Sequence, residues 1–328
     1  MTSSYREAGV DIRLEADGVA ALVRELTHRR AGPYAPVGGT GHFAGLIEFG
    51  EHVLALATDG VGTKMMVADA VGDWSTVGID CIAMNVNDLY VMNIEPVAFV
   101  DYIATERVDP AQMAELGRGL NEGARLANLS IVGGETATLA GLVNGLDLAG
   151  TVLGVQRRDR VITGEACRPG DVVIGLPSSG VHSNGLSLAR RIAEAHGGYG
   201  QPFGTSTLGR ELLTPTRIYS EVLGIAERHE VHGMCHITGG GLLNLARLTD
   251  LGFSIDSPLP VPPVFAWLQE QGGVPEDEMY RTFNMGMGFV LVVPANEAGP
   301  MTREVPGAQV VGRCTAEPGI RLRGVPVE

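Results

Sequence analysis

Apolar and polar residues recur along the chain with two spacings, one of about two residues and one of about 3.6, which are typical of strands and helices. Pro110 stands in the first turn of one predicted helix, where its missing N–H is tolerated. The predicted strands and helices alternate along the chain, which is typical of a layered α/β fold. Strands are predicted over residues 52–59, 96–104, 231–238 and 288–294, and helices over residues 75–92, 110–128, 183–196 and 215–229.

A polar and charged stretch interrupts this alternation near the middle of the chain. The apolar run 146–155 is followed by "QRRDRVITGEACRPGD", and apolar residues resume at 172–177. Such a short polar connection is typical of a link between domains. With 328 residues, of which 45% are hydrophobic, the chain is long enough for two domains. We therefore expect an N-terminal domain over residues 1–160 and a C-terminal domain over residues 161–328.

The charge of the chain argues against two classes of partner. A formal net charge of -14 and a pI near 5.0 oppose broad attraction to nucleic acid or to an anionic membrane surface. No apolar run reaches the length of a membrane span, and the first residues carry charges where a signal peptide needs apolar residues. We expect a soluble, cytoplasmic protein. The four cysteines form no CxxC pair and are expected to be reduced packing residues.

The segment "ATDGVGTKM" joins a predicted strand to a glycine-rich turn that begins at Asp59. Such a turn can bring backbone N–H groups close to an anion. It is not a Walker A loop, because threonine precedes Lys64 and Met65 follows it. Several such turns suit a ligand with more than one phosphate group, although each alone is more often a plain turn. Similar small-residue turns are expected at residues 37–45, 131–136, 177–185 and 236–241.

Lys64 is the only lysine among the 24 basic residues of the chain, and the others are arginine. Codon bias could leave one lysine by chance. We hypothesise instead that its compact ammonium contacts a phosphate oxygen of the ligand where the planar guanidinium of arginine would not fit.

The first predicted helix carries a candidate metal site. At about 100° per residue, Asp80, Asn87 and Asp88 fall on one side of it, and apolar residues fall on the other. Its polar side offers short oxygen ligands in place of the Lys, Arg and Glu of an ordinary solvated face. Magnesium is typically held by one or two carboxylates plus substrate phosphates. Asp59, Asp88 and Glu135 would form such a site if folding brings them together.

Nine segments, taken in order, resemble one known family. The chain is similar to the aminoimidazole ribonucleotide synthetases, also called phosphoribosylformylglycinamidine cyclo-ligases, of purine biosynthesis. The resemblance implies two α/β domains and a homodimer whose N-terminal sheets join in a barrel across the interface. It also implies ATP and magnesium as cofactors, with potassium as a further family expectation. The matching segments are "YREAGVDI", "TDGVGTK", "GIDCIAMNVNDL", "EPVAFVDYIA", "VGGETA", "SSGVHSNGLSLAR", "LTPTRIY", "HITGGGLLNLARL" and "FNMGMG".

The reaction implied by the resemblance closes an imidazole ring. ATP activates the amide oxygen of formylglycinamidine ribonucleotide as a phosphate ester, and an internal nitrogen then attacks and expels phosphate. Aminoimidazole ribonucleotide, ADP and phosphate are the products. Such chemistry needs positioning and charge neutralisation more than an enzyme nucleophile, and no serine or cysteine of the chain stands in a convincing nucleophile elbow.

The resemblance also assigns roles to individual residues. Magnesium is expected at Asp59, Asp88 and Glu135. The catalytic candidates are Lys64, His182 and His236, of which the two histidines are candidates for proton transfer or hydrogen bonding. The ATP-binding residues are expected to be Gly38, Gly39, Gly41, Asp59, Gly60, Gly62, Thr63, Lys64, Asp80, Asn87, Gly133, Gly134 and Thr136. The substrate-binding residues are expected to be Ser178, Ser179, His182, Ser183, Asn184, Thr238, Gly239 and Gly240.

The chain departs from the family pattern at two loops, and other functions stay open. His42 stands among the glycines of the first loop, and Thr138-Leu139-Ala140 replaces the usual Glu-Met-Pro. Selenophosphate synthetase would need a reactive cysteine near the N-terminus, and none precedes Cys81. A hydrogenase-maturation dehydratase would be expected to end in a cysteine, whereas this sequence ends in "VPVE". The remaining alternatives are a thiamine-phosphate kinase, the larger amidine synthetase, a silent nucleotide-binding subunit and a metal-dependent phosphatase.

Overall fold

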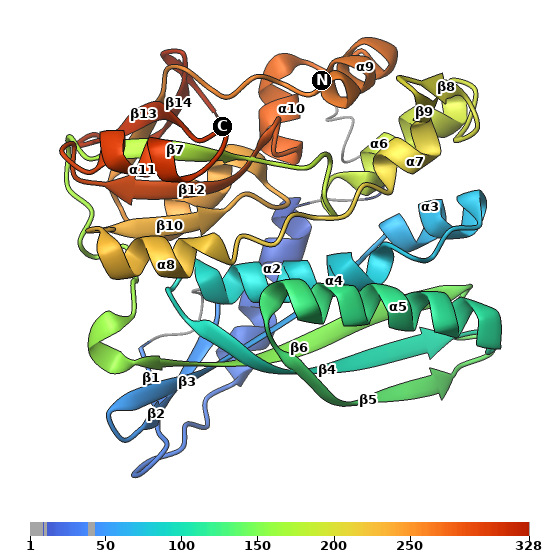
Figure 1. Ribbon diagram of the computed structural model, residues 1–328, viewed down its shortest axis with the longest axis horizontal. Helices are drawn as coiled ribbons and strands as arrows, with labels where there is room; N and C mark the ends of the chain where they lie inside the picture. The colour runs from blue at the N-terminus through green and yellow to red at the C-terminus, as the bar shows by residue number, and fades with distance from the viewer. Residues whose placement is uncertain (1–8, 10–11, 39–42, 328) are drawn as a thin grey trace.

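The described part of the chain forms two large β-sheets and one two-stranded sheet, with helices packed between and around the large sheets (Figure 1). The computed structural model describes residue 9 and residues 12–38 and 43–327. The predicted nucleotide-loop residues Gly39 and Gly41, together with His42, lie outside the described residues.

The first sheet contains six strands in the order β1-β2-β3-β6-β4-β5. Neighbouring strands are antiparallel except for β4 and β5, which are parallel. The connection from β4 to β5 is therefore a crossover, and α5 supplies it. The strands are β1 Pro36–Val37, β2 Gly45–Phe49, β3 His52–Gly60, β4 Glu95–Thr105, β5 Ser130–Thr138 and β6 Leu146–Arg157.

Helices α4 (Val77–Tyr90) and α5 (Pro110–Ala127) cover one face of the first sheet. Asp109 caps α5 by accepting hydrogen bonds from the backbone N–H groups of Ala111 and Gln112, and Pro110 follows the cap as predicted. The two helices approach closely because glycines meet at their crossing. A methyl group added at Gly78 would lie 2.3 Å from the backbone nitrogen of Leu120.

The second sheet contains seven strands in the order β10-β12-β7-β13-β11-β14-β15. It is antiparallel apart from the pair β11 and β14. All seven residues of β12 are buried, which is why this strand reads as one continuous apolar run. The strands are β7 Val172–Pro177, β10 Gly233–His236, β11 Gly252–Ile255, β12 Met287–Val293, β13 Gln309–Thr315, β14 Gly319–Leu322 and β15 Val325–Pro326.

Shorter elements complete the described part of the chain. The turn of 3-10 helix η1 (Arg158–Arg160) follows the last strand of the first sheet, and β7 opens the second sheet. The others are α2 Ile12–Glu25, α3 Lys64–Val71, α6 Leu186–Ala195, β8 Pro202–Phe203, β9 Ser206–Thr207, α7 Leu208–Leu212, α8 Glu221–Arg228, η2 Gly241–Arg247, α9 Pro263–Gly272, α10 Glu276–Thr282 and α11 Ala298–Glu304.

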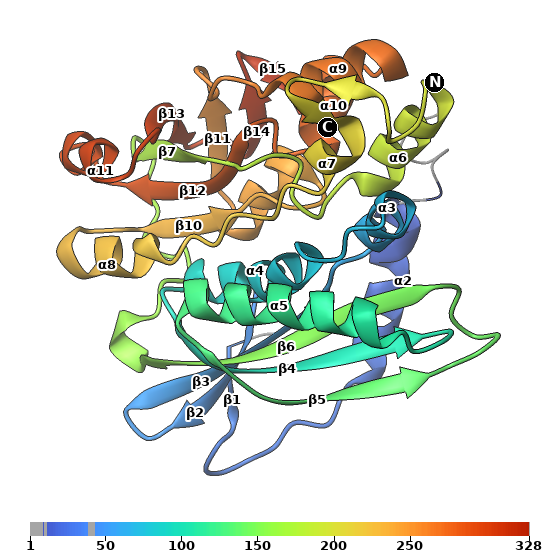
Figure 2. The ribbon, with the colours of Figure 1, turned by 45° about the vertical axis from the view of Figure 1, so that its right-hand side comes forward.

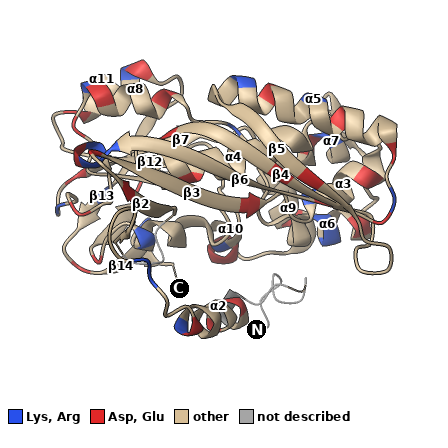
Figure 3. Ribbon diagram, turned by 90° about the horizontal axis from the view of Figure 1, so that it is seen from below, with Lys and Arg blue, Asp and Glu red and all other residues tan. Residues whose placement is uncertain are grey.

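Helices α4 and α5 lie between the first sheet and the second domain (Figure 2). The inner face of the sheet is therefore covered, whereas its outer face is open. Leu56, Val100 and Tyr102 are each about two-fifths exposed on this outer face. Figure 3 views the molecule from the side of this face and shows few charged residues along β3, β6 and β4. Helix α2 is exposed along its described length and lies apart from both domains.

Most of the predicted elements are confirmed, and two predictions were wrong. Residues 131–136 belong to strand β5 and do not form a glycine turn, because their backbone pairs with β4. The helix predicted over residues 215–229 begins only at Glu221. Residues 215–219 have no regular secondary structure, since their backbone groups bond to side chains of α4. All four cysteines are free and buried, as predicted.

None of the helices in the described part of the chain combines the length and the hydropathy that crossing a bilayer requires.

Candidate active site

Two acidic residues share the helix-covered face of the first sheet. Cross-strand pairing places Asp59, Gly150, Asp101 and Gly134 in one row over four neighbouring strands. Residues in one row point to the same face of a sheet. A methyl group added at Gly134 would lie 2.5 Å from Oδ1 of Asp101, so that carboxylate leans over the glycine. Sequence reasoning missed Asp101, whose only signal was an acid inside an apolar strand.

Asp59 stands at the end of β3, held there by the side chain of Asn85 on α4. The backbone N–H of Asp59 donates to Oδ1 of Asn85 at 2.9 Å, and Nδ2 of Asn85 donates to the carbonyl of Asp59 at 3.1 Å. Burial, together with the negative charge of Asp88, raises the pKa of Asp59 to about 6. Two carboxylates that repel each other in a partly buried place have the chemistry of a cation site.

Asp88 also contacts the second domain. Its Oδ1 lies 3.4 Å from Nδ1 of His236, which is the last residue of β10 and is fully buried. Nε2 of His236 lies 3.3 Å from Nδ2 of Asn87. The two domains therefore meet at Asp88 through a histidine that sequence reasoning had assigned to catalysis.

Lys64 is fully buried and has three acceptors within the chain. Its Nζ lies 2.9 Å from each carboxylate oxygen of Asp80 and 2.7 Å from the carbonyl oxygen of Thr214. Oδ1 of Asp80 also accepts hydrogen bonds from the backbone N–H and the hydroxyl of Thr216, at 2.7 and 2.6 Å. The predicted phosphate contact of Lys64 stays a prediction, and in this structure its ammonium joins the two domains.

The polar side of α4 therefore faces the second domain, and two of its three polar positions named above are not open to solvent. Asp80 and Asn87 are fully buried against residues 214–219. Their predicted contact with ATP also stays a prediction. The observed contacts explain why this side of the helix lacks long charged residues, since no space remains for them.

The loop at residues 178–185 brings predicted substrate residues against α4 and the segment 214–219. The hydroxyl of Ser179 donates to the carbonyl of Pro215 at 2.6 Å. Oγ of Ser183 lies 3.3 Å from the hydroxyl of Thr216. Nδ2 of Asn184 lies 3.8 Å from the sulfur of Met84.

His182, within this loop, is fully buried and has a left-handed backbone, with φ of 64°. Its Nε2 accepts a hydrogen bond from the backbone N–H of Ser179 at 3.2 Å. Burial lowers the pKa of His182 well below its ordinary value, so the ring is neutral. Its proton therefore sits on Nδ1, which has no partner among the described residues. Oγ of Ser178 is a second buried polar atom without a described partner.

The turn after β10 is held by one amide side chain. Nδ2 of Asn244 lies 3.2 Å from the carbonyl of Gly239 and 2.9 Å from that of Gly241. The hydroxyl of Thr238 donates to Oδ1 of the same residue at 3.3 Å. Gly240 has φ of 98°, which favours glycine.

The remaining predicted residues lie around the end of β3 and along β5. Gly60 ends β3, and Gly62 has φ of 67° in the turn that follows. The hydroxyl of Thr63 lies 3.3 Å from that of Ser187. Gly38 accepts a hydrogen bond from Arg29 at 2.7 Å. Gly133 and Thr136 lie within β5, far from any turn.

Glu135 faces away from Asp59 and Asp88. Strand pairing places it in one row with Gly60, Ala149 and Tyr102, which is the row next to that of Asp59. Neighbouring rows point to opposite faces, so Glu135 stands on the open outer face. Across the residues that the structure describes, no three His, Cys, Asp or Glu side chains gather closely enough to hold a metal ion.

Comparisons with known proteins identify the family. Residues 41–156 match the family described as "AIR synthase related protein, N-terminal domain", and residues 168–325 match "AIR synthase related protein, C-terminal domain". The phosphoribosylformylglycinamidine cyclo-ligase of Methanosarcina barkeri is 50% identical to this chain, with 99% of this chain and 98% of the relative covered. The chain belongs to the AIR synthase family.

Solved structures share the AIR synthase fold at low identity. "AaThiL complexed with AMPPCP and TMP" superposes with a TM-score of 0.68 and 17% identity, covering 95% of this chain and 94% of that chain. "T. maritima PurL complexed with ADP" superposes with a TM-score of 0.59 and 17% identity, covering 89% of this chain and 45% of that chain. At these identities the likeness concerns the fold alone.

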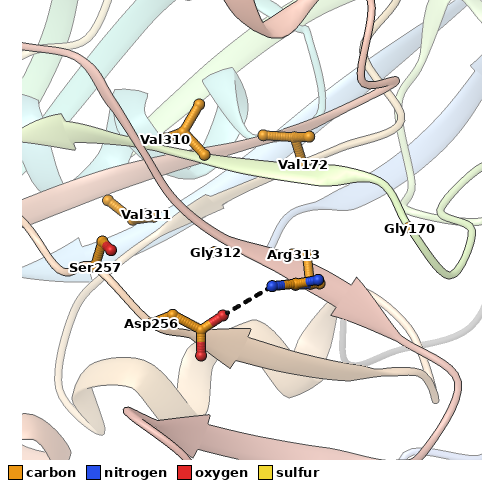
Figure 4. Close-up of a pocket in the computed structure, with 8 residues that line it drawn as sticks. All are labelled: Gly170, Val172, Asp256, Ser257, Val310, Val311, Gly312 and Arg313. Carbon is orange, nitrogen blue, oxygen red and sulfur yellow. Dashed lines mark ion pairs between the residues drawn. The ribbon is translucent and has the colours of Figure 1, made fainter.

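A hollow of about 320 Å³ lies on the second sheet of this AIR synthase family member, away from the acids (Figure 4). It contains an ion pair between Asp256 and Arg313, with 3.5 Å between nitrogen and oxygen. Both side chains are exposed, and none of the predicted site residues lines this hollow.

Proposed function

We propose that this chain closes formylglycinamidine ribonucleotide to aminoimidazole ribonucleotide, consuming ATP and releasing ADP and phosphate in purine biosynthesis. The observation that carries the proposal is the 50% identity, over nearly the whole length of both chains, to a curated cyclo-ligase. The acids at the domain border add to it, because phosphoryl transfer needs bound cations and positioned groups.

A bound nucleotide is supported by the fold and by the acids. Solved structures with this fold include a complex with AMPPCP and a complex with ADP. Asp59 and Asp88 fit a magnesium ion, because burial and then the charge of Asp88 raise the pKa of Asp59, and a cation would stabilise both carboxylates. When bound, magnesium would neutralise phosphate charge. Asp101, on the same face as Asp59, is a further acid of this site, and potassium stays a family expectation.

The substrate side is proposed to be the loop at 178–185 together with the turn at 238–240. Nδ1 of His182 and Oγ of Ser178 support this assignment, because a buried polar atom without a partner is costly unless a ligand meets it. His182 would then donate one hydrogen bond from Nδ1 to an oxygen of the substrate. The proposed substrates are ATP and a ribonucleotide, which fits a cytoplasmic location.

A homodimer through the outer face of the first sheet also belongs to this proposal. Exposed apolar residues on that face, such as Leu56, Val100 and Tyr102, form a surface that a partner would cover. Glu135 lies in the same row as Tyr102 and would then stand within the interface. Its proposed metal role would require the dimer, because within one chain it faces away from Asp59.

The deciding experiment incubates the pure protein with formylglycinamidine ribonucleotide, ATP, magnesium and potassium. We expect aminoimidazole ribonucleotide and ADP to appear in equal amounts. ADP release that does not depend on the ribonucleotide would contradict the proposal. Thiamine monophosphate serves as a second substrate, because turnover with it would favour a kinase.

A further inference from the structure

Asn87 lies between the two domains with its amide orientation fixed at both ends. Its Oδ1 accepts a hydrogen bond from the backbone N–H of Tyr219 at 3.1 Å. Its Nδ2 donates to the carbonyl of Arg217 at 2.9 Å. Rotating the amide by half a turn would place donor against donor at one end and acceptor against acceptor at the other. Only one orientation is therefore compatible with the backbone of residues 217–219.

This orientation determines which nitrogen of His236 carries the proton. Nδ2 of Asn87, which can only donate, lies 3.3 Å from Nε2 of His236. Nε2 must therefore accept and carries no hydrogen, so the ring N–H is on Nδ1. Nδ1 lies 3.4 Å from Oδ1 of Asp88, which can accept that hydrogen.

The surroundings of His236 leave its ring little freedom. The side chain is fully buried, and the rings of Tyr219 and Phe289 lie at centroid distances of 6.5 and 6.4 Å. Residues 233–236 pair with β12 in the second sheet, so the ring is fixed to the second domain. Asp88, by contrast, belongs to α4 of the first domain and keeps about one-fifth of its side chain exposed.

We propose that His236 is a positioning residue: Asn87 fixes it as the Nδ1–H tautomer, and its Nδ1–H holds the carboxylate of Asp88 beside Asp59. It does not exchange a proton with the substrate, since Nε2 faces Asn87 and Nδ1 faces Asp88. Docking of the second domain thereby completes the acid pair of the first. Histidine–carboxylate contacts of this kind are known to orient metal-binding groups. The role of the oriented Asp88 in turnover rests on the proposed function, whereas the tautomer does not.

The tautomer is tested by 15N nuclear magnetic resonance of histidine-labelled protein without metal, with His236 assigned from the loss of its signals in the His236→Asn variant. We expect Nδ1 to be protonated and Nε2 to be bare. A protonated Nε2 would overturn the proposal, whatever the protein turns over. The result does not depend on activity, so it separates failure of this inference from failure of the proposed function.

Two variants separate positioning from proton transfer. Asparagine at position 236 places an amide N–H near the place of Nδ1, whereas glutamine places its amide near Nε2. We expect His236→Gln to raise the magnesium concentration for half-maximal turnover by about 10- to 100-fold, and His236→Asn to stay close to wild type. Binding of Mn²⁺, followed by electron paramagnetic resonance, should weaken in the glutamine variant alone.

A proton-transfer role predicts a different pattern, because neither amide can exchange a proton. Equal loss of turnover in both variants, with unchanged Mn²⁺ binding, would overturn the proposal. His52, on the exposed surface of β3, supplies the matched control, since His52→Gln should change neither measurement. If both variants at position 236 fail to fold, the ring signals of His236 are assigned in the wild-type protein through its backbone resonances, and the tautomer measurement still decides.

Discussion

At the scale of single residues, the central finding is that the only lysine of the chain is buried in an ion pair. Three acceptors surround Nζ of Lys64, two from Asp80 and one from Thr214. Burial lowers the pKa of Lys64, and the charge of Asp80 opposes that shift. Arginine would not fit this sealed space, since its planar fork is larger and needs more acceptors. A single lysine in an arginine-rich chain therefore has a structural explanation.

Replacing Lys64 with methionine should destabilise the protein strongly. The substitution keeps most of the length of the side chain but leaves the carboxylate of Asp80 buried without its counter-charge, which typically costs about 3–5 kcal/mol. We expect a loss of this size in the free energy of unfolding measured with urea. The double variant Lys64→Met with Asp80→Asn should recover part of it, because no uncompensated charge remains.

If Lys64 contacts a phosphate instead, the Lys64→Met variant should lose turnover and keep its stability. Loss of a contact to a reacting phosphate lowers turnover by about 100- to 1000-fold without lowering the free energy of unfolding. Unchanged stability of Lys64→Met with such a loss of turnover would therefore contradict the buried ion pair as the reason for this lysine.

Asp88→Asn should weaken magnesium binding while leaving the fold intact. Asparagine can still accept the hydrogen bond from His236 but carries no charge, and the pKa of Asp59 should fall because the repulsion is gone. We expect the magnesium concentration for half-maximal turnover to rise at least tenfold, because removing one residue that supports a metal site typically weakens metal binding by about 10- to 100-fold. Asp256→Asn, an exposed acid on the second sheet, is the control. Unchanged magnesium dependence in Asp88→Asn would remove this residue from the metal site.

At the scale of elements, the ends of α8 and α11 are joined by a histidine between two acids. Nδ1 of His229 lies 2.7 Å from Glu297, and Nε2 lies 2.6 Å from Glu304. Both nitrogens can donate only when the ring is protonated. Hydrogen bonds to Glu304 and Glu297 therefore raise the pKa of His229 above its ordinary value of 6.5.

This contact predicts that the difference in melting temperature between wild type and His229→Gln depends on pH. The pKa of His229 is higher in the folded chain than in the unfolded chain. Its contribution to folding stability is therefore fully present below pH 6.5 and is lost as the pH rises through the pKa of the folded chain. We expect the melting temperature of His229→Gln to lie below wild type in mild acid and to approach it in mild base. A constant difference across this range would contradict a protonated histidine, and His196→Gln is the control.

At the scale of the whole molecule, two exposed surfaces have the character of surfaces that a partner covers. The outer face of the first sheet exposes Val100 and Tyr102, and helix α2 is exposed along its described length. An isolated helix of 14 residues is marginal in water, so its stability depends on packing against another surface. A second copy of the chain could cover the sheet face, in line with the proposed dimer.

Tyr102→Glu should break the proposed dimer. A charge placed on the apolar outer face would have to be buried in the interface, which is costly without a counter-charge. We expect the variant to run as a monomer in size-exclusion chromatography with light scattering, and its turnover to fall if Glu135 acts across the interface. Val310→Glu, on the exposed part of the second sheet, should leave the oligomeric state unchanged. Dimers of unchanged affinity in Tyr102→Glu would place the interface elsewhere.

The sequence by itself determined the local structure, the two-domain plan and the family. Periodicity predicted β3, α4, β4, α5 and β12, because these elements are set by which residues must face a core. It also selected Asp59 and Asp88 of the first domain as candidates, although it missed Asp101. The absence of helix at residues 215–219 was not predictable, since side chains of α4 that lie more than a hundred residues away bind that backbone.

Only the tertiary structure decided which of these residues meet. Asp101 faces the same side as Asp59, whereas Glu135 faces the other, because strand register sets the direction of each side chain. The sequence pattern predicted that the polar face of α4 binds a metal. In the structure, Asp80 and Asn87 on this face are buried in contacts with the second domain. Spacing along a chain fixes which side of an element a residue occupies, but the surface packed against that side comes from distant parts of the chain.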